Sequence, residues 1–263
     1  MLKAAAETTY INDILPDGKG TVLISLGDTQ GLFWYKNGKL LEYPNVKFYY
    51  VSPQQKKLIF FYGTHQVRPY IMNLATMAVQ RLPGKLDHGW LVYTVGLSFS
   101  PSENQLLYED WEQGTLGIYD LESQKEAYRL QEKGHDLIEG SWSPGGKIIA
   151  YLKQDKKEPP IDLGGDGRAG MGHQLAVYDL EKPQVIKEWT GKKLFNSRPI
   201  WSPNGEYLLC NIVESLEDNT ELKEEPYLIN IKTGEVRKIT SETYRKRNWA
   251  LRFLSLLTWI QLS

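Results

Sequence analysis

The 263-residue sequence predicts an all-β fold built from a repeated unit of four short antiparallel strands. The first indication is a recurring stretch that reads aromatic, Ser-Pro, turn residues and then an apolar run, clearest at 141–154 (SWSPGGKIIAYLKQ) and 200–213 (IWSPNGEYLLCNIV). The second is its period, because five such stretches recur at intervals of about 40 to 60 residues, as in repeat proteins. The third is the abundance of tyrosine (16) and tryptophan (8), which suit the surfaces of strands. The prolines of the five stretches are Pro16, Pro53, Pro101, Pro144 and Pro203.

Each unit divides into four strands separated by turn residues. Within 136–190, DLIEGSWS alternates loosely, KIIAYLK and HQLAVYDL are apolar runs, and QVIKEWTG alternates again before a glycine. Short runs rich in β-branched and aromatic residues predict strands, not helices. The same pattern fits residues 95–131 and 196–240.

The recurring residues have local reasons to be where they are. In Ser-Pro-x-Gly, proline pre-sets φ, glycine accepts a positive φ, and the serine hydroxyl is expected to bond the backbone two residues on. An Asp or Asn at the end of each third strand is expected to cap the following turn with its side chain. The aromatic residue before the serine is expected to fill the space between adjacent sheets. These caps are Asn73, Asp120, Asp179 and Asn230, and these aromatics are Phe99, Trp142 and Trp201.

Repeated four-stranded units of this period predict a β-propeller, in which each blade packs face to face on its neighbours. Residues 1–240 are assigned to the propeller and 241–263 to a partial sixth blade or an atypical C-terminal tail, with a short amphipathic helix as a further alternative. An unfinished blade exposes strand edges, so self-association through an edge strand is expected at this end. The five recognisable repeats lie near 10–45, 46–84, 91–131, 136–191 and 196–240.

The pattern W-S-P-x-G, then Φ-x-Φ-[D/N]-L, then R-x-Φ-T resembles the repeat of TolB-type β-propellers, relatives of WD-repeat proteins. The resemblance covers about residues 10–240. Its first unit lacks the serine and the Asp or Asn, and the second and third have Gln55 and Glu103 where glycine is expected. The resemblance implies a bacterial propeller, often in the cell envelope and often a protein-binding platform; related propellers also accompany serine-peptidase domains or act as polysaccharide lyases. The residues that match the TolB-type repeat best are Trp201, Ser202, Pro203, Gly205, Asn230, Gly234, Arg237 and Thr240.

Composition and charge limit the kinds of partner and site that the chain is expected to have. With 31 basic and 32 acidic residues the net charge is −1, so no global field favours nucleic acid. The single cysteine, Cys210, excludes an internal disulfide and a thiolate metal site, and it is expected to be a small buried side chain. The absence of an apolar run of about 18 residues predicts no membrane span. The start, MLKAAAETTY, lacks the apolar core of a signal peptide, which fits either a cytoplasmic chain or a mature secreted one.

In a propeller of this connectivity, loops between second and third strands emerge on the same face as loops that join consecutive blades. Two long insertions fall at that position, 154–172 and 214–226, and we call this end of the blades the long-loop face. The first insertion is rich in glycine and predicts a flexible flap; its DLGGDG lacks the alternating oxygen ligands and closing glutamate of a calcium loop. The acidic second insertion predicts a solvated tongue. Long loops in a compact fold are often functional.

All four histidines are expected on the long-loop face, His65 and His173 between second and third strands and His88 and His135 between blades. Loops collect polar residues, and imidazoles together with carboxylates can also hold a divalent metal. We expect no shared metal shell, no cofactor and no catalytic residue. The predicted ligand-binding residues are His88, His135, Asp136, Asp166, Arg168, His173 and Arg198.

Two functions from different classes remain. The sequence has no G-x-S-x-G elbow, no P-loop and no dinucleotide fingerprint. The leading interpretation is therefore a non-catalytic TolB-like propeller that binds a protein or peptide through its long-loop face. The alternative is a metal-dependent propeller enzyme such as a polysaccharide lyase, which depends on the histidines alone.

Overall fold

In the computed structural model of the chain, regular structure is formed by strands, and none of the described residues is α-helical. The expected all-β class is therefore confirmed. The described residues are 13–14, 22–25, 31–36, 39–44, 46–54, 56–63, 68–83, 86, 97–157, 172–195, 198–217 and 221–239. Among them, no helix is long and apolar enough to cross a membrane.

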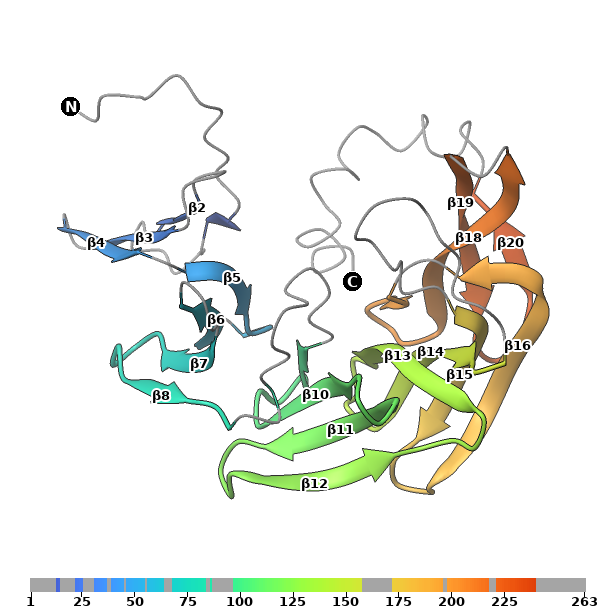
Figure 1. Cartoon of the computed structure of the whole chain (residues 1–263), viewed down its shortest axis with the longest axis horizontal. Helices are drawn as coiled ribbons and strands as arrows, with labels where there is room; N and C mark the ends of the chain where they lie inside the picture. The colour runs from blue at the N-terminus through green and yellow to red at the C-terminus, as the bar shows by residue number, and fades with distance from the viewer. Residues whose placement is uncertain are drawn as a thin grey trace. The chain divides into compact units, whose positions relative to one another are not determined.

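The chain divides into two compact units, Met1–Tyr93 and Thr94–Ser263. The described strands of the first unit form two antiparallel four-stranded sheets in which sequence neighbours pair (Figure 1). One contains β1 (Asp13–Ile14), β2 (Val22–Ser25), β3 (Gly31–Lys36) and β4 (Lys39–Pro44). The other contains β5 (Val46–Val51), β6 (Lys57–Tyr62), β7 (Arg68–Asn73) and β8 (Val79–Arg81). In the second sheet, the ring of Phe60 stacks on that of Tyr70 at 5.5 Å between centroids.

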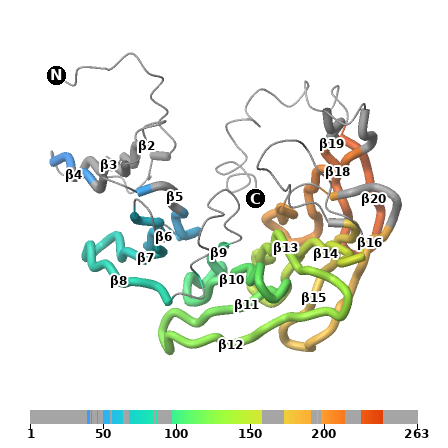
Figure 2. The backbone as a smooth tube through the Cα atoms, in the orientation of Figure 1, coloured from blue at the N-terminus to red at the C-terminus, as the bar shows by residue number. Residues whose placement is uncertain are grey.

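The second unit repeats this antiparallel pattern three times along the path drawn in Figure 2. The first set is β9 (Ser98–Phe99), β10 (Gln105–Asp110), β11 (Thr115–Asp120) and β12 (Lys125–Leu130). The second is β13 (His135–Trp142), β14 (Ile148–Asp155), β15 (Gly172–Asp179) and β16 (Gln184–Phe195). The third is β17 (Ile200–Trp201), β18 (Tyr207–Glu217), β19 (Glu221–Asn230) and β20 (Val236–Lys238). The end of β16 pairs with β18, so the last two sets join into one eight-stranded sheet.

The two insertions differ from each other. The described residues of the acidic stretch, 214–217 and 221–226, are not a loop, because they extend the paired strands β18 and β19, with Leu216 opposite Leu222. Antiparallel pairing satisfies backbone N–H and C=O groups that an irregular loop would leave to water. In the first insertion, 158–171 lies outside the described residues, and so does the C-terminal segment 241–263, whose blade, tail and edge-strand predictions stay predictions.

The Ser-Pro turns keep their predicted backbone, but the serine bond differs from the prediction. The hydroxyl Oγ of Ser143 accepts the N–H of Ile148 at 3.2 Å, and that of Ser202 accepts the N–H of Tyr207 at 2.9 Å. The bond therefore spans five residues, not two, because the turn carries the chain back past the serine before the next strand begins. The Oγ atoms of Ser52 and Ser100 accept from Lys57 and Gln105 in the same way.

The fourth turn position needs a positive φ in every Ser-Pro turn where it is described. Gly146 and Gly205 adopt φ values of 68° and 71°, as predicted for glycine. Glu103 adopts φ 60° at the equivalent position, so the third repeat keeps the turn without glycine. The Asp and Asn caps are also confirmed: Oδ1 of Asp120 accepts the N–H of Ser123 at 2.7 Å, and the other three caps bond in the same manner. Those three are Asn73, Asp179 and Asn230.

The apolar core of the second unit lies between sheets. Along β14, Ile149 and Tyr151 pack in one cluster with β10 and β11, while Ala150 and Leu152 pack in another with β18 and β19. Burial on both faces explains why these strands read as continuous apolar runs.

The predicted inter-sheet role of the tryptophans is confirmed. Trp142 lies in the first of these clusters and Trp201 in the second, each 8% exposed. Their indole N–H groups donate to the backbone oxygens of Ser98 and Ser141, both at 3.3 Å. Each tryptophan thus reaches from the first strand of its own four-stranded set to the first strand of the preceding set.

Candidate functional site

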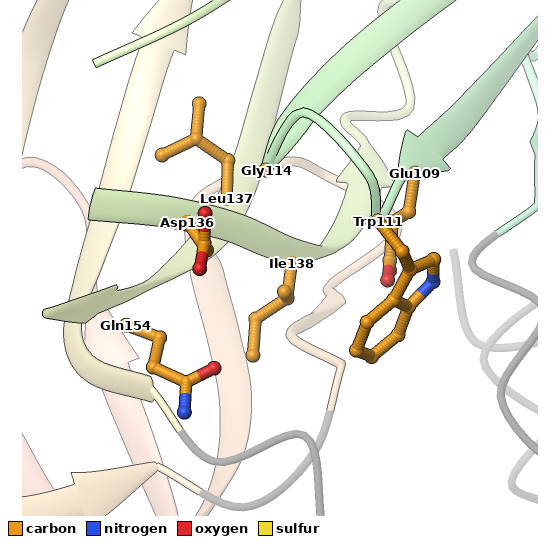
Figure 3. Close-up of a pocket in the computed structure, with 7 residues that line it drawn as sticks. All are labelled: Glu109, Trp111, Gly114, Asp136, Leu137, Ile138 and Gln154. Carbon is orange, nitrogen blue, oxygen red and sulfur yellow. The ribbon is translucent and has the colours of Figure 1, made fainter. Parts of the chain in front are cut away.

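A small pocket of about 40 Å³ lies at one end of β10, β11, β13 and β14, in the second unit (Figure 3). Its walls come from the β10–β11 hairpin, the start of β13 and the end of β14, which is the long-loop face of these sheets. We call it the blade-end pocket. It is lined by Glu109, Trp111, Gly114, Asp136, Leu137, Ile138 and Gln154.

The β10–β11 hairpin is docked on β13 through Gly114. Its N–H donates to the backbone oxygen of Asp110 at 2.7 Å, and its own oxygen accepts the N–H of Leu137 at 3.1 Å. Gly114 has φ 66°, and a Cβ there would lie 1.7 Å from Oδ1 of Asp136. Glycine is therefore needed both for the turn and for the approach of the Asp136 carboxylate, which also contacts the ammonium of Lys156 at 2.9 Å.

Strand β13 carries a β-bulge beside the pocket. Its register with β14 shifts between Ile138 and Ser141, and Glu139 within the bulge adopts φ 55°, a strained value for a residue with a side chain. The bulge directs the N–H of Glu139 at Oε1 of Glu109, 2.6 Å away, so that β10 and β13 are joined at this point.

Glu109 is the most perturbed acid at the site. It is 1% exposed, and among the described residues its Oε2 has no hydrogen-bond partner. Burial, followed by repulsion from Glu139, raises the pKa of Glu109 to about 8, while Arg198 and the backbone N–H groups of Glu139 and Gly140 act in the opposite direction. The carboxyl is therefore mainly neutral at pH 7.

Arg198 lies just before β17 and contacts strand β13 and the residue that precedes β9. Its Nη1 donates to the backbone oxygen of Leu97 at 3.1 Å, and its Nε lies 3.5 Å from Oε2 of Glu139. The guanidinium therefore belongs to the group formed by Glu109 and Glu139, and it does not line the blade-end pocket.

Two of the predicted histidines lie at the same end of one sheet. His135 begins β13 and is opposite Asp155, whose N–H donates to Nδ1 of His173 at 3.1 Å. His173 is in strand β15, however, and not in a loop as expected. His65, His88, Asp166 and Arg168 lie outside the described residues.

Of the predicted ligand-binding residues that the structure describes, Asp136 alone lines the pocket. Within the described ranges, no three histidine, cysteine, aspartate or glutamate side chains are placed to hold a metal ion. Sequence reasoning missed Glu109, Trp111 and Gln154. The available signal was an acid inside the apolar run QLLYED of β10, where a core strand would carry an apolar residue.

The fold is similar to that of two solved structures. The chain is similar to TolB from Acinetobacter baumannii, with a TM-score of 0.54 and 18% identity over 84% of this chain and 54% of that one. It is also similar to Kuenenia stuttgartiensis hydrazine synthase, with a TM-score of 0.57 and 12% identity over 91% of this chain and 69% of that one. The chain thus spans about half the length of this TolB. No protein-family model matches the sequence.

At these identities the similarity concerns the fold alone. Together with the antiparallel four-stranded sheets, it shows a TolB-like β-propeller architecture. The function must be argued from the site.

Proposed function

We propose that this chain is a non-catalytic propeller scaffold that binds a protein or peptide at its long-loop face. The observation that carries the proposal is the blade-end pocket, in which a buried carboxyl lacks a partner for one oxygen at the end of the sheets where the sequence placed a ligand site. Its lining residues are held by the paired strands β10–β11 and β13–β14, and a site preformed in this way lowers the entropic cost of binding. The TolB-type resemblance supports the same class of function.

The size of the pocket favours a side chain as its occupant. Its 40 Å³ exceeds the roughly 10–15 Å³ that one water needs. Pockets for free small molecules are about 300–1,000 Å³. A pocket of intermediate size fits one side-chain end of a larger partner, whose remaining contacts lie on the surrounding surface. Trp111, partly exposed at this face, is the type of residue that dominates binding energy in such contacts.

The metal-dependent enzyme has no comparable support. In the described part of the chain, no three histidine, cysteine, aspartate or glutamate side chains are placed to hold a metal ion. No observation in the described residues favours it over the scaffold.

A displayed random peptide library, selected against the immobilised full chain, tests the proposal. Selected peptides should lose at least about tenfold in affinity for Trp111→Ala, because aromatic anchors carry much of the energy of an interface. The matched controls Glu122→Gln and Lys182→Ala change exposed residues in the turns at the opposite ends of the same sheets and should bind as the unmodified chain does. Peptides that bind all variants equally, or a selection that yields none, would refute the assignment.

A further inference from the structure

We propose that the blade-end pocket receives the ammonium group of a lysine side chain from the bound peptide. This inference rests on the proposed function and specifies the chemistry of the partner. It starts from the polar groups that the pocket presents.

These polar groups can all accept a hydrogen bond. Asp136 and Gln154 lie on one side of the pocket and Glu109 on the other, with Ile138 between them (Figure 3). A lysine ammonium has three donors and no acceptor, so carboxylate and amide oxygens on opposite walls suit it. Oε2 of Glu109 is buried and lacks a partner among the described residues, so once the carboxyl ionises it offers a strong acceptor that no other group uses. Because this oxygen has almost no exposed surface, a small rotation of the carboxyl must accompany binding.

The remaining wall of the pocket and its volume also favour an ammonium group. Trp111 presents an indole ring beside Glu109, and indole is the best aromatic partner for a cation. The 40 Å³ volume is enough for an ammonium with its adjoining methylene, the compact charged end of a lysine side chain.

The charged groups around Glu109 determine how readily its carboxyl ionises. Glu139 from β13 repels it, and Arg198 from the segment before β17 attracts it. At the rim, Asp136 is paired with Lys156, but both side chains are substantially exposed (39% and 48%), so this ion pair is weak and is readily replaced. Burial favours the protonated acid, and an arriving ammonium favours the carboxylate. Binding therefore releases a proton, and the affinity rises as the pH rises from about 6 to 8.

The test uses the full chain and the lysine side-chain analogue n-butylammonium chloride, with N-butylacetamide as the neutral control. Binding is followed by the ¹H–¹⁵N resonance of the Trp111 indole, assigned with Trp111→Phe. We expect a saturable shift with a dissociation constant on the order of millimolar, as for small fragments. Glu109→Gln should weaken it roughly tenfold and abolish its rise with pH, since a charge-assisted bond is lost. Glu122→Gln, in the turn at the other end of the sheet, should leave it unchanged.

An unmoved indole resonance, an equal shift with N-butylacetamide, or undiminished binding by Glu109→Gln would each overturn the lysine pocket. Acetylating the lysines of peptides selected in the library experiment separates the two proposals. If such peptides bind at the long-loop face as tightly after acetylation, the lysine pocket is refuted and the scaffold stands. If n-butylammonium binds as expected but no peptide is selected, the pocket chemistry stands and the scaffold is refuted.

Discussion

Trp201→Ala removes the side chain that fills the space between the last two four-stranded sets. Trp201 is 8% exposed, packs in the cluster with Leu175 and Leu208, and donates its indole N–H to Ser141. Burial of about 200 Å² of aromatic surface at about 25 cal/mol/Å² gives roughly 5 kcal/mol. This is an upper bound, because the unfolded chain already buries part of that surface. We therefore expect a loss of about 3–5 kcal/mol in the free energy of unfolding, typical of buried aromatic truncations.

Urea denaturation followed by far-UV circular dichroism measures this loss. The matched control is Ile200→Ala, on the preceding residue of the same two-residue strand, whose side chain is 41% exposed and should lose less than about 1 kcal/mol. Trp201→Phe keeps most of the packing and removes the hydrogen bond to Ser141, so an intermediate loss of about 1–2 kcal/mol is expected. A loss below about 1 kcal/mol for Trp201→Ala would show that the packing between the sets is not as the structure has it.

Three further predictions test the turns, the core and the buried acid. Gly146→Ala should cost about 1–2 kcal/mol in urea melts because of its φ of 68°, while the adjacent Gly145→Ala, which meets no atom within 4 Å, should be nearly neutral; equal losses would argue against the turn. Cys210, whose thiol pKa is raised to about 12 by burial, should react with a thiol reagent only after denaturation, and rapid labelling of the native chain would contradict its placement. The pKa of Glu109 is higher in the folded than in the unfolded chain, so the stabilisation that its protonated form gives the fold is complete below about pH 4. This stabilisation is lost as the pH rises to about 8, at up to about 1.4 kcal/mol per pH unit. Glu109→Gln should flatten that part of the pH–stability profile, and an unchanged profile would refute the raised pKa.

The candidate site was predictable only in part. Asp136 was selected because it adjoins His135, and its place at this end of the sheets was predicted from the repeat, which fixes which strand ends lie together. Glu109 was missed because an acid within QLLYED gives no sign of its partner: the N–H of Glu139, which the bulge of β13 brings to it, lies 30 residues further on. The histidines were predicted as site residues because imidazole is a common ligand of metals. In the structure, His135 and His173 flank Asp155 and do not line the pocket.

The sequence by itself determined the all-β class, the four-strand repeat, the positive φ of the Ser-Pro turns and the inter-sheet tryptophans Trp142 and Trp201. These depend on short-range causes: the φ preferences of proline and glycine, side-chain caps, and the period-two alternation of strands. Tertiary structure decided that 214–226 is a hairpin, that the serine bond spans five residues, and that Glu109, Asp136 and Trp111 share a pocket. The hairpin and the serine bond are short-range features, but they depend on backbone geometry that the residue pattern does not specify. The pocket arises where strands distant in sequence meet, and pairing and burial between those strands fix it.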